Sequence, residues 1–244
     1  MVNQGDSGRF RVRVGAGTTV AADVDGAWFE ALAAEDRKLQ ELLLHGIGHG
    51  LVGYARGHAV LHGSSVSHAG KGLGILGPSG QGKSTLCASL CRESWEFVSD
   101  VMIVVEPETR RLLGQQRRWR LRDDSLIELG ELPDDLPIDD DHTRKRRLLC
   151  DDVSVGSADI FLERVVVLKN ADMLELVELG PVDAILALVT NSYVAERLEP
   201  DPSAHLLRLA SALQVNGVRV FALGYPHRWD VLKELGPVLR SLLD

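Results

Sequence analysis

Apolar and polar positions alternate at the start of residues 9–24, and this period of two predicts a strand. The next stretch, residues 26–48, spaces its apolar positions as a helix does. From residue 51 the pattern changes to short β-rich runs that follow one another closely. We therefore expect a small α+β lead-in module over residues 1–50 and a main domain over residues 51–244.

Within the main domain, strand-like and helix-like segments alternate, which predicts an α/β fold. Residues 54–77 suit antiparallel strands or hairpins that lead into a core strand, and residues 83–94 suit a helix. Residues 96–114 predict a strand that continues through a turn at Pro107–Thr109. The later segments are strands at 158–170 and 218–226 and helices at 181–198, 202–217 and 229–244.

Residues 112–150 are polar and are interrupted by Pro133 and Pro137. They predict irregular structure with one short helix near residues 124–129.

One sequence motif predicts a binding site. The sequence "GPSGQGKS" at residues 77–84 fits G-x-x-x-x-G-K-[ST] at every position, a match expected by chance on the order of one time in a hundred for a chain of this length. The segment before it is strand-like and the segment after it is helix-like, as a phosphate-binding P-loop requires. The sequence therefore predicts a site for a phosphorylated nucleotide with Mg²⁺.

Each residue of the motif has a physical role in that prediction. The glycines let the backbone N–H groups point inward as an anion nest, and the helix adds its positive N-terminal end. Lys83 can reach the β- and γ-phosphates, Ser84 can bind Mg²⁺, and Thr85 can contact the α-phosphate. The predicted nucleotide-binding residues are Gly77, Pro78, Ser79, Gly80, Gln81, Gly82, Lys83, Ser84 and Thr85.

Two further residues are candidates for the same site. Asp100 follows Lys83 by 17 residues, which leaves room for one helix and a short return to the phosphates. It can bind Mg²⁺, directly or through water, or take a proton from an attacking hydroxyl; it can also be a plain turn former. His62 ends an apolar run and precedes the small residues Gly63, Ser64 and Ser65, which permit close approach of the backbone.

The bulk composition narrows the classes of function. The chain has 244 residues, is 45% hydrophobic and carries a net charge of −8, which argues against a general nucleic-acid binder. A short basic run, residues 144–147, is either a solvated loop or a source of phosphate contacts. The N-terminus has no apolar signal region and no run of about 18 apolar residues occurs, so we expect no membrane span and a cytoplasmic protein.

Neither the cysteines nor the pair His45 and His49 predicts a metal site. Cys87, Cys91 and Cys150 form a sparse, odd set that suggests a reducing compartment, and the first two suit packing in a helix. His45 and His49 are four apart, but we expect the glycines at 46, 48 and 50 to interrupt the helix they would share. Metal binding is not favoured at either place.

The segment from residue 59 to residue 100, "AVLHGSSVSHAGKGLGILGPSGQGKSTLCASLCRESWEFVSD", resembles the catalytic domain of HPr kinase/phosphorylase and its looser relatives, the HPr-kinase-like serine kinases. The shared features are a His–Gly pair, a hairpin, the P-loop, a helix and an Asp-bearing strand. The match is specific across residues 56–105 and weaker out to about residue 226. It implies a P-loop core related to the HPr kinase C-terminal domain and to phosphoenolpyruvate carboxykinase.

The resemblance also implies roles for individual residues. Lys83 corresponds to the phosphate lysine, Ser84 to the Mg²⁺ ligand, Asp100 to the general base that faces the acceptor serine, and His62 to its polar neighbour. Lys145 or Arg146 corresponds to a basic residue near the phosphates. The implied activity is ATP- and Mg²⁺-dependent transfer of the γ-phosphate to a serine-like hydroxyl of a peptide or protein, such as a ribosomal peptide precursor of the lasso type.

The chain departs from the family at Val101, where the family has a second Asp, and it lacks a counterpart of the glycine-rich signature of the true HPr enzymes. Glu106 or Asp151 is a candidate for the missing carboxylate. The departures keep two alternatives open: a kinase of a free small molecule such as serine, and a nucleotide-binding regulator without transfer activity. Whether the chain forms a homo-oligomer is also left open.

Overall fold

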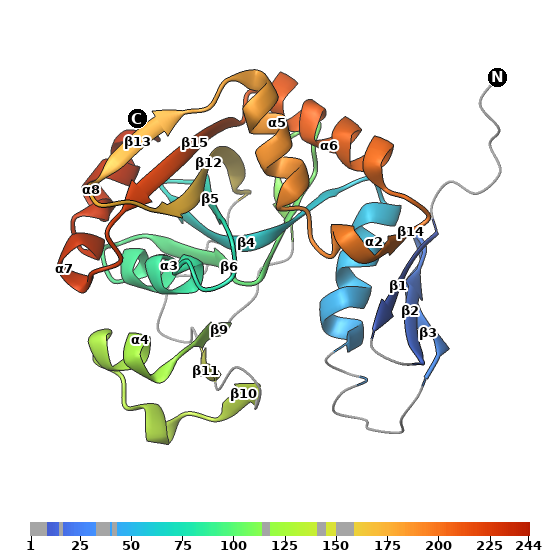
Figure 1. The fold of residues 1–244 in the computed structure, drawn as a ribbon, viewed down its shortest axis with the longest axis horizontal. Coiled ribbons are helices and arrows are strands. Elements are labelled where there is room, and N and C mark those ends of the chain that lie inside the picture. Colours follow the sequence, from blue (N-terminus) through green and yellow to red (C-terminus); the bar gives the residue numbers. More distant parts are fainter. Residues whose placement is uncertain are drawn as a thin grey trace.

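The computed structural model describes residues 9–14, 17–32, 40, 43–113, 118–140, 145–149 and 159–244. A central mixed sheet has the strand order β13-β15-β12-β5-β4-β7-β8, with β6 also paired to β4 (Figure 1). Its strands are β4 (Ala59–His68), β5 (Lys71–Leu76), β6 (Glu96–Ser99), β7 (Met102–Val105), β8 (Leu112–Leu113), β12 (Phe161–Asn170), β13 (Glu175–Glu178) and β15 (Arg219–Tyr225).

Helices cover both faces of this sheet. The pair α5 (Pro181–Thr190) and α6 (Ser203–Val215) packs on one face, while α3 (Lys83–Cys91), α7 (Trp229–Leu232) and α8 (Leu235–Ser241) pack on the other (Figure 1). Val165 of β12 belongs to the core under α5 and α6, and its neighbour Val166 belongs to the core under α3. A strand buried on both faces must be apolar at successive positions, which explains the unbroken apolar run of β12.

The three parallel strands are β5, β12 and β15, which lie side by side. Their carboxyl ends therefore meet at one edge of the sheet, which is where α/β proteins commonly bind ligands. The loop after β5 and the segment after β15 both lie at this edge.

β4 is the long strand that joins the parallel centre to the antiparallel edge. It pairs with β5 along one side. Along its other side it pairs first with β7, from Ala59 to His62, and then with β6, from Ser65 to Ser67. The two residues between β6 and β7 are Asp100 and Val101, so they lie opposite the middle of β4.

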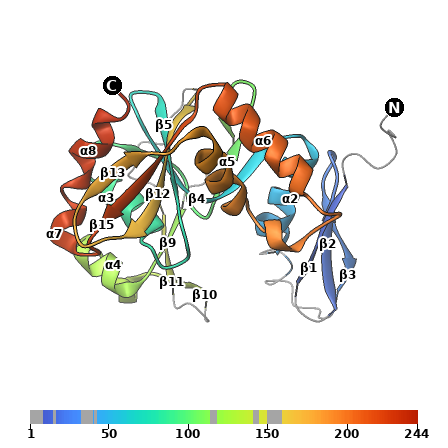
Figure 2. The same cartoon turned by 45° about the horizontal axis from the view of Figure 1, so that its top comes forward.

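A separate four-stranded sheet holds the N-terminal strands (Figure 2). Its order is β14 (Leu198–Glu199), β1 (Phe10–Val14), β2 (Thr18–Ala22) and β3 (Ala27–Ala31). Beside it lie the π-helical turn η1 (Leu44–Gly48) and helix α2 (His49–Ala55). Buried residues of this sheet belong to the same hydrophobic cluster as residues of β4, α5 and α6. The domain boundary at residue 50 stays a prediction.

A small antiparallel sheet lies below α3 (Figure 1). Its strand order is β10 (Ile138–Asp140), β11 (Lys145–Leu149) and β9 (Arg118–Leu121). In the chain, α4 (Asp123–Glu128) and the short η2 helix (Pro133–Asp135) lie between β9 and β10. α4 confirms the short helix expected near residues 124–129. The three strands were not expected, because paired polar strands do not alternate strongly enough to be detected in sequence.

The α/β class, the hairpin before residue 77, the helix after it and the strands β12 and β15 are confirmed. Besides the irregular structure expected for residues 112–150, three expected helices are wrong. Residues 27–31 are a strand, since pairing with β2 outweighs their helical spacing. The helix from Pro181 ends at Thr190, where Asn191 turns its amide back onto Ala187 O. The last helix is broken into α7 and α8, because Pro237 is tolerated only in the first turn of a new helix.

No helix within the described ranges is long and apolar enough to cross a membrane.

A substitution at Gly63 tests how closely β4 packs against β5. A Cβ at this position would lie 2.5 Å from the backbone oxygen of Ile75, so both strands would have to move apart. We expect Gly63→Ala to lower the free energy of unfolding by about 2 kcal/mol, measured by urea denaturation. The matched control is Gly26→Ala, where nothing lies within 4 Å. Equal stabilities for the two variants would contradict the packing described here.

Candidate functional site

Residues 77–84, here called the glycine loop, connect β5 to α3 at the carboxyl edge of the parallel strands. Gly77, Gly80 and Gly82 have φ angles of 136°, 85° and 82°, which other residues rarely adopt. The loop begins with a bond to α5: the Gly77 N–H donates to Asn191 Oδ1 at 3.1 Å. The backbone of this loop therefore turns at all three glycines of the motif, and loops whose backbone N–H groups converge can bind anions.

Lys83 closes the glycine loop on itself. Its ammonium donates to Gly77 O at 2.7 Å and to Pro78 O at 3.0 Å, and the residue is only 9% exposed. The pKa of Lys83 is lowered, mainly by burial and secondly by the positive charge of Lys145. Among the described residues, this ammonium binds two loop carbonyls and no carboxylate, so it can turn toward an anion in the same loop without breaking an ion pair there.

Asp100 is the best-connected polar group of the site. It is 1% exposed, and its Oδ1 accepts hydrogen bonds of 2.7 Å from both Ser64 Oγ and Ser84 Oγ. Its Oδ2 accepts from the Arg120 N–H at 3.1 Å. A carboxylate has about four acceptor sites, so within the described part of the chain Oδ2 keeps one direction for a further donor.

His62 lies on β4 beside this carboxylate but does not hydrogen-bond to it among the described residues. Its backbone N–H donates to Asn191 O at 2.7 Å, and its ring stacks on Tyr193 with 6.1 Å between centroids. Burial, and next the charge of Lys83, lowers the pKa of His62, while the Asp100 charge opposes this. The imidazole is therefore uncharged near neutral pH.

Val101 has an unusual backbone. Its φ angle is 74°, in the left-handed region that β-branched residues avoid. The Gly63 N–H donates to Val101 O at 3.2 Å and holds this residue opposite β4. Backbone strain of this kind is concentrated at functional sites, and here it lies next to Asp100.

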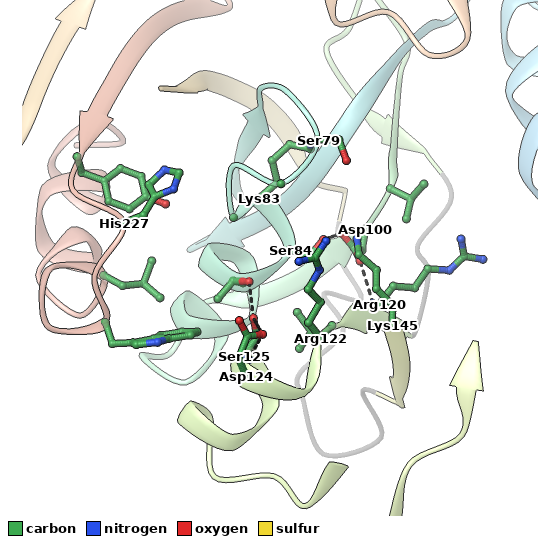
Figure 3. Close-up of a pocket in the computed structure, with 18 of the residues that line it drawn as sticks. Ser79, Lys83, Ser84, Asp100, Arg120, Arg122, Asp124, Ser125, Lys145 and His227 are labelled. Atoms are coloured by element: carbon green, nitrogen blue, oxygen red, sulfur yellow. Dashed lines mark hydrogen bonds between the residues drawn. The ribbon is translucent and has the colours of Figure 1, made fainter. Parts of the chain in front are cut away.

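These groups open onto one cavity of about 390 Å³ (Figure 3). From the predicted set it is lined by His62, Ser79, Gly80, Gly82, Lys83, Ser84, Thr85, Asp100 and Lys145. The remaining loop residues contribute in other ways: Gly77 and Pro78 offer carbonyls to Lys83, and the Gln81 N–H turns back to Pro78 O at 3.4 Å. The structure thus brings most of the predicted residues together.

The basic run contributes one residue to the cavity. Lys145 lines it, whereas its neighbour on β11, Arg146, is bound to Asp123 at 2.8 Å and to Asp134 at 3.2 Å. Alternate residues of a strand point to opposite faces, which explains the difference. Arg144 lies outside the described residues.

Neither candidate for the missing carboxylate is seen in the cavity. Glu106 accepts a hydrogen bond from Thr109 and lies 3.9 Å from Arg111, beyond the far end of β7. Asp151 lies outside the described residues, as does Cys150.

Cys87 and Cys91 are unpaired thiols of α3, and Cys87 is fully buried in the core, as expected of packing residues. The glycines near His45 and His49 do not interrupt the helical course, contrary to expectation. They let Tyr193 approach instead, since a Cβ on Gly50 would lie 2.8 Å from its ring. The described residues contain no group of three or more His, Cys, Asp or Glu side chains that could hold a metal.

The donor set nevertheless fits Mg²⁺ bound together with phosphates. Ser84 and Asp100 offer one hydroxyl and one carboxylate, both oxygen ligands, within hydrogen-bond distance of each other. Mg²⁺ in nucleotide sites uses one or two such protein ligands and takes the rest from phosphates and water.

Several functional residues escaped sequence reasoning. Ser64 was noted only for its small size, although a polar residue inside a buried strand is itself a signal. Asn191 carried no signal, because its role depends on where α5 ends in space. The aromatic and basic residues after β15 follow a buried parallel strand, a position from which they could have been identified.

No protein-family model matches the chain, and no curated protein matches its sequence. Among solved structures, the Hpr(Ser) kinase/phosphatase from Coxiella burnetii has a TM-score of 0.37 and 12% sequence identity, covering 75% of this chain and 88% of that chain. At this level the likeness carries no argument about fold or activity.

A substitution at Val101 tests whether the backbone next to Asp100 is strained. Glycine in the left-handed region avoids a penalty of about 1–2 kcal/mol and costs about 0.5–1 kcal/mol of unfolded-state entropy. We therefore expect Val101→Gly to raise the free energy of unfolding by about 0.5 kcal/mol in urea denaturation.

The control is Val105→Gly, a fully buried position of β7, which should lose about 3 kcal/mol. A loss of the same size in Val101→Gly would show that the residue is not strained.

Proposed function

We propose that the protein is an ATP-dependent kinase that transfers the γ-phosphate to a serine-like hydroxyl of a peptide or protein. The observation that carries this is the hydrogen bond between Ser84, at the foot of the glycine loop, and the buried carboxylate of Asp100. It joins a triphosphate-binding loop and a proton acceptor in one cavity.

The donor half of the site is the glycine loop. Its N–H groups and the first turn of α3 offer positive partial charge to the triphosphate. The Lys83 ammonium leaves the Gly77 and Pro78 carbonyls and binds the β- and γ-phosphates. Mg²⁺, when bound by Ser84 and Asp100, supplies charge neutralisation between the phosphates.

The acceptor half is the open direction at Asp100 Oδ2. The acceptor hydroxyl donates there, its oxygen forms the new bond to the γ-phosphorus, and the bond from that phosphorus to the β-phosphate oxygen breaks. Asp100 receives the proton, and ADP leaves. Ser64 and the Arg120 N–H fix the carboxylate for this step, and such positioning is the main source of rate in phosphoryl transfer.

His62 supports the acceptor side without a charge of its own. Its lowered pKa keeps the imidazole neutral, so it can accept a hydrogen bond from the acceptor. It lines the cavity with Lys145 and Asp100.

A nucleotide-binding regulator is the second candidate, and Val101 favours it. The position next to Asp100 carries no carboxylate, so the site offers one acidic side chain where two would bind metal and proton separately. The two functions share nucleotide binding and differ in transfer.

Transfer by the wild-type protein separates them, and Asp100→Asn tests whether Asp100 is the base. We expect this variant to bind ATP and to lose at least about 100-fold in transfer rate, because an amide cannot accept the proton. The measurement is incorporation of label from γ-labelled ATP with Mg²⁺ into serine-containing peptides and free serine. Asp124→Asn, which changes a carboxylate of the same cavity, should keep its activity.

Lys83→Ala should abolish ATP binding and thus distinguishes a binding failure from a transfer failure. Full activity in Asp100→Asn would contradict Asp100 as the base. Wild-type protein that binds ATP and labels neither an acceptor nor water would overturn the kinase and establish the regulator.

A further inference from the structure

The cavity has two chemically different ends. At one end lie charged groups: Asp100, Arg120 and Lys145. At the other lies what we call the aromatic wall, formed by Tyr225, His227, Trp229 and Leu232 from the end of β15 through α7. Arg228 also lines this end, and its guanidinium is paired with Asp230. Figure 3 shows His227 and Asp100 on opposite sides of Lys83.

The aromatic wall is built onto the glycine loop. A Cβ placed on Gly82 would lie 3.3 Å from Tyr225 Oη, so the loop and the end of β15 are in direct contact. Tyr225 is 3% exposed, and the His227 ring packs against it with 5.1 Å between centroids.

Within the aromatic wall, Trp229 provides the flat ring surface. It is half-buried and packs against the core below α3, together with the buried Leu232. One part of its ring system is therefore fixed by the core while the residue still lines the cavity. A fixed, partly open indole suits stacking against a planar ring.

The direction of the bound nucleotide follows from the proposed function, on which this inference rests. The γ-phosphate faces Asp100, and Thr85, the next residue of α3 after Ser84, faces the α-phosphate. Thr85 Oγ1 lies 3.0 Å from Ser125 Oγ. In Figure 3, Ser125 lies to the left of Asp100, as His227 does. The nucleoside attached to the α-phosphate must extend further in that direction.

We propose that the aromatic wall is the nucleobase subsite, in which the base of the nucleotide stacks on Trp229. The phosphates then account for the end of the cavity at Lys83 and Ser84, and the base accounts for the aromatic end. Stacking on an aromatic side chain accepts any base, because each base has a π-face. The space beside Asp100, beyond the γ-phosphate, stays available to the acceptor.

The test compares two probes, ATP and inorganic tripolyphosphate, in titration calorimetry with Mg²⁺. Trp229→Ala should weaken ATP binding about tenfold and leave tripolyphosphate binding unchanged, since only ATP has a base. Trp229→Phe should restore most of the ATP affinity. Trp28→Ala, on β3 of the N-terminal sheet, is the matched control and should bind both probes as the wild type does.

A second measurement does not depend on the stability of a variant. In wild-type protein, ATP should quench tryptophan fluorescence and tripolyphosphate should not, because Trp229 is the tryptophan that lines the cavity while Trp95 and Trp119 are buried in the core. Unchanged ATP affinity in Trp229→Ala, or equal losses for both probes, would overturn the base subsite. Wild-type protein that binds ATP no better than tripolyphosphate would also overturn it. If the wild type binds neither probe, the proposed function itself fails.

Discussion

The site depends on the buried carboxylate of Asp100. It accepts hydrogen bonds from three separate elements: Ser64 of β4, Ser84 of α3 and the backbone of β9 at Arg120. A charge that is 1% exposed is tolerated only because these donors replace its hydration. The same bonds hold the glycine loop, the central sheet and the small antiparallel sheet to one another around this carboxylate.

The backbone around Asp100 is arranged to support this. β4 has small residues where the chain opposite it must leave regular strand geometry: Gly63 faces Val101, and Ser64 faces Asp100. The left-handed conformation of Val101 breaks the strand into β6 and β7. On the other side Asn191 ties the glycine loop to α5 through its side chain and ties β4 to α5 through its carbonyl. His62, Asp100 and Lys83 are therefore positioned by rigid elements, which is what phosphoryl transfer requires.

The glycine loop, Lys83, Ser84, Asp100 and His62 could be predicted from sequence because each depends on local order: a strand, a turn, a helix and the return strand. The fold class and the long strands β4, β12 and β15 could be predicted for the same reason. What could not be predicted depends on contacts distant in sequence. β3 was mistaken for a helix because its strand character comes from β2, and Asn191 and the aromatic wall reach the loop only through the sheet order. Lys145 could not be distinguished from Arg146 until the pairing of β11 showed which side chain faces the cavity.

In the proposed function, the resting contacts of Lys83 and Asp100 are exchanged for contacts with a triphosphate. A crystal structure of the protein with Mg²⁺ and a non-hydrolysable ATP analogue would show whether this exchange occurs. We expect the Lys83 ammonium to move from the Gly77 and Pro78 carbonyls to the β- and γ-phosphates, and the direct bond between Ser84 and Asp100 to open. An analogue bound elsewhere, with Lys83 still on the two carbonyls and Ser84 still on Asp100, would contradict it.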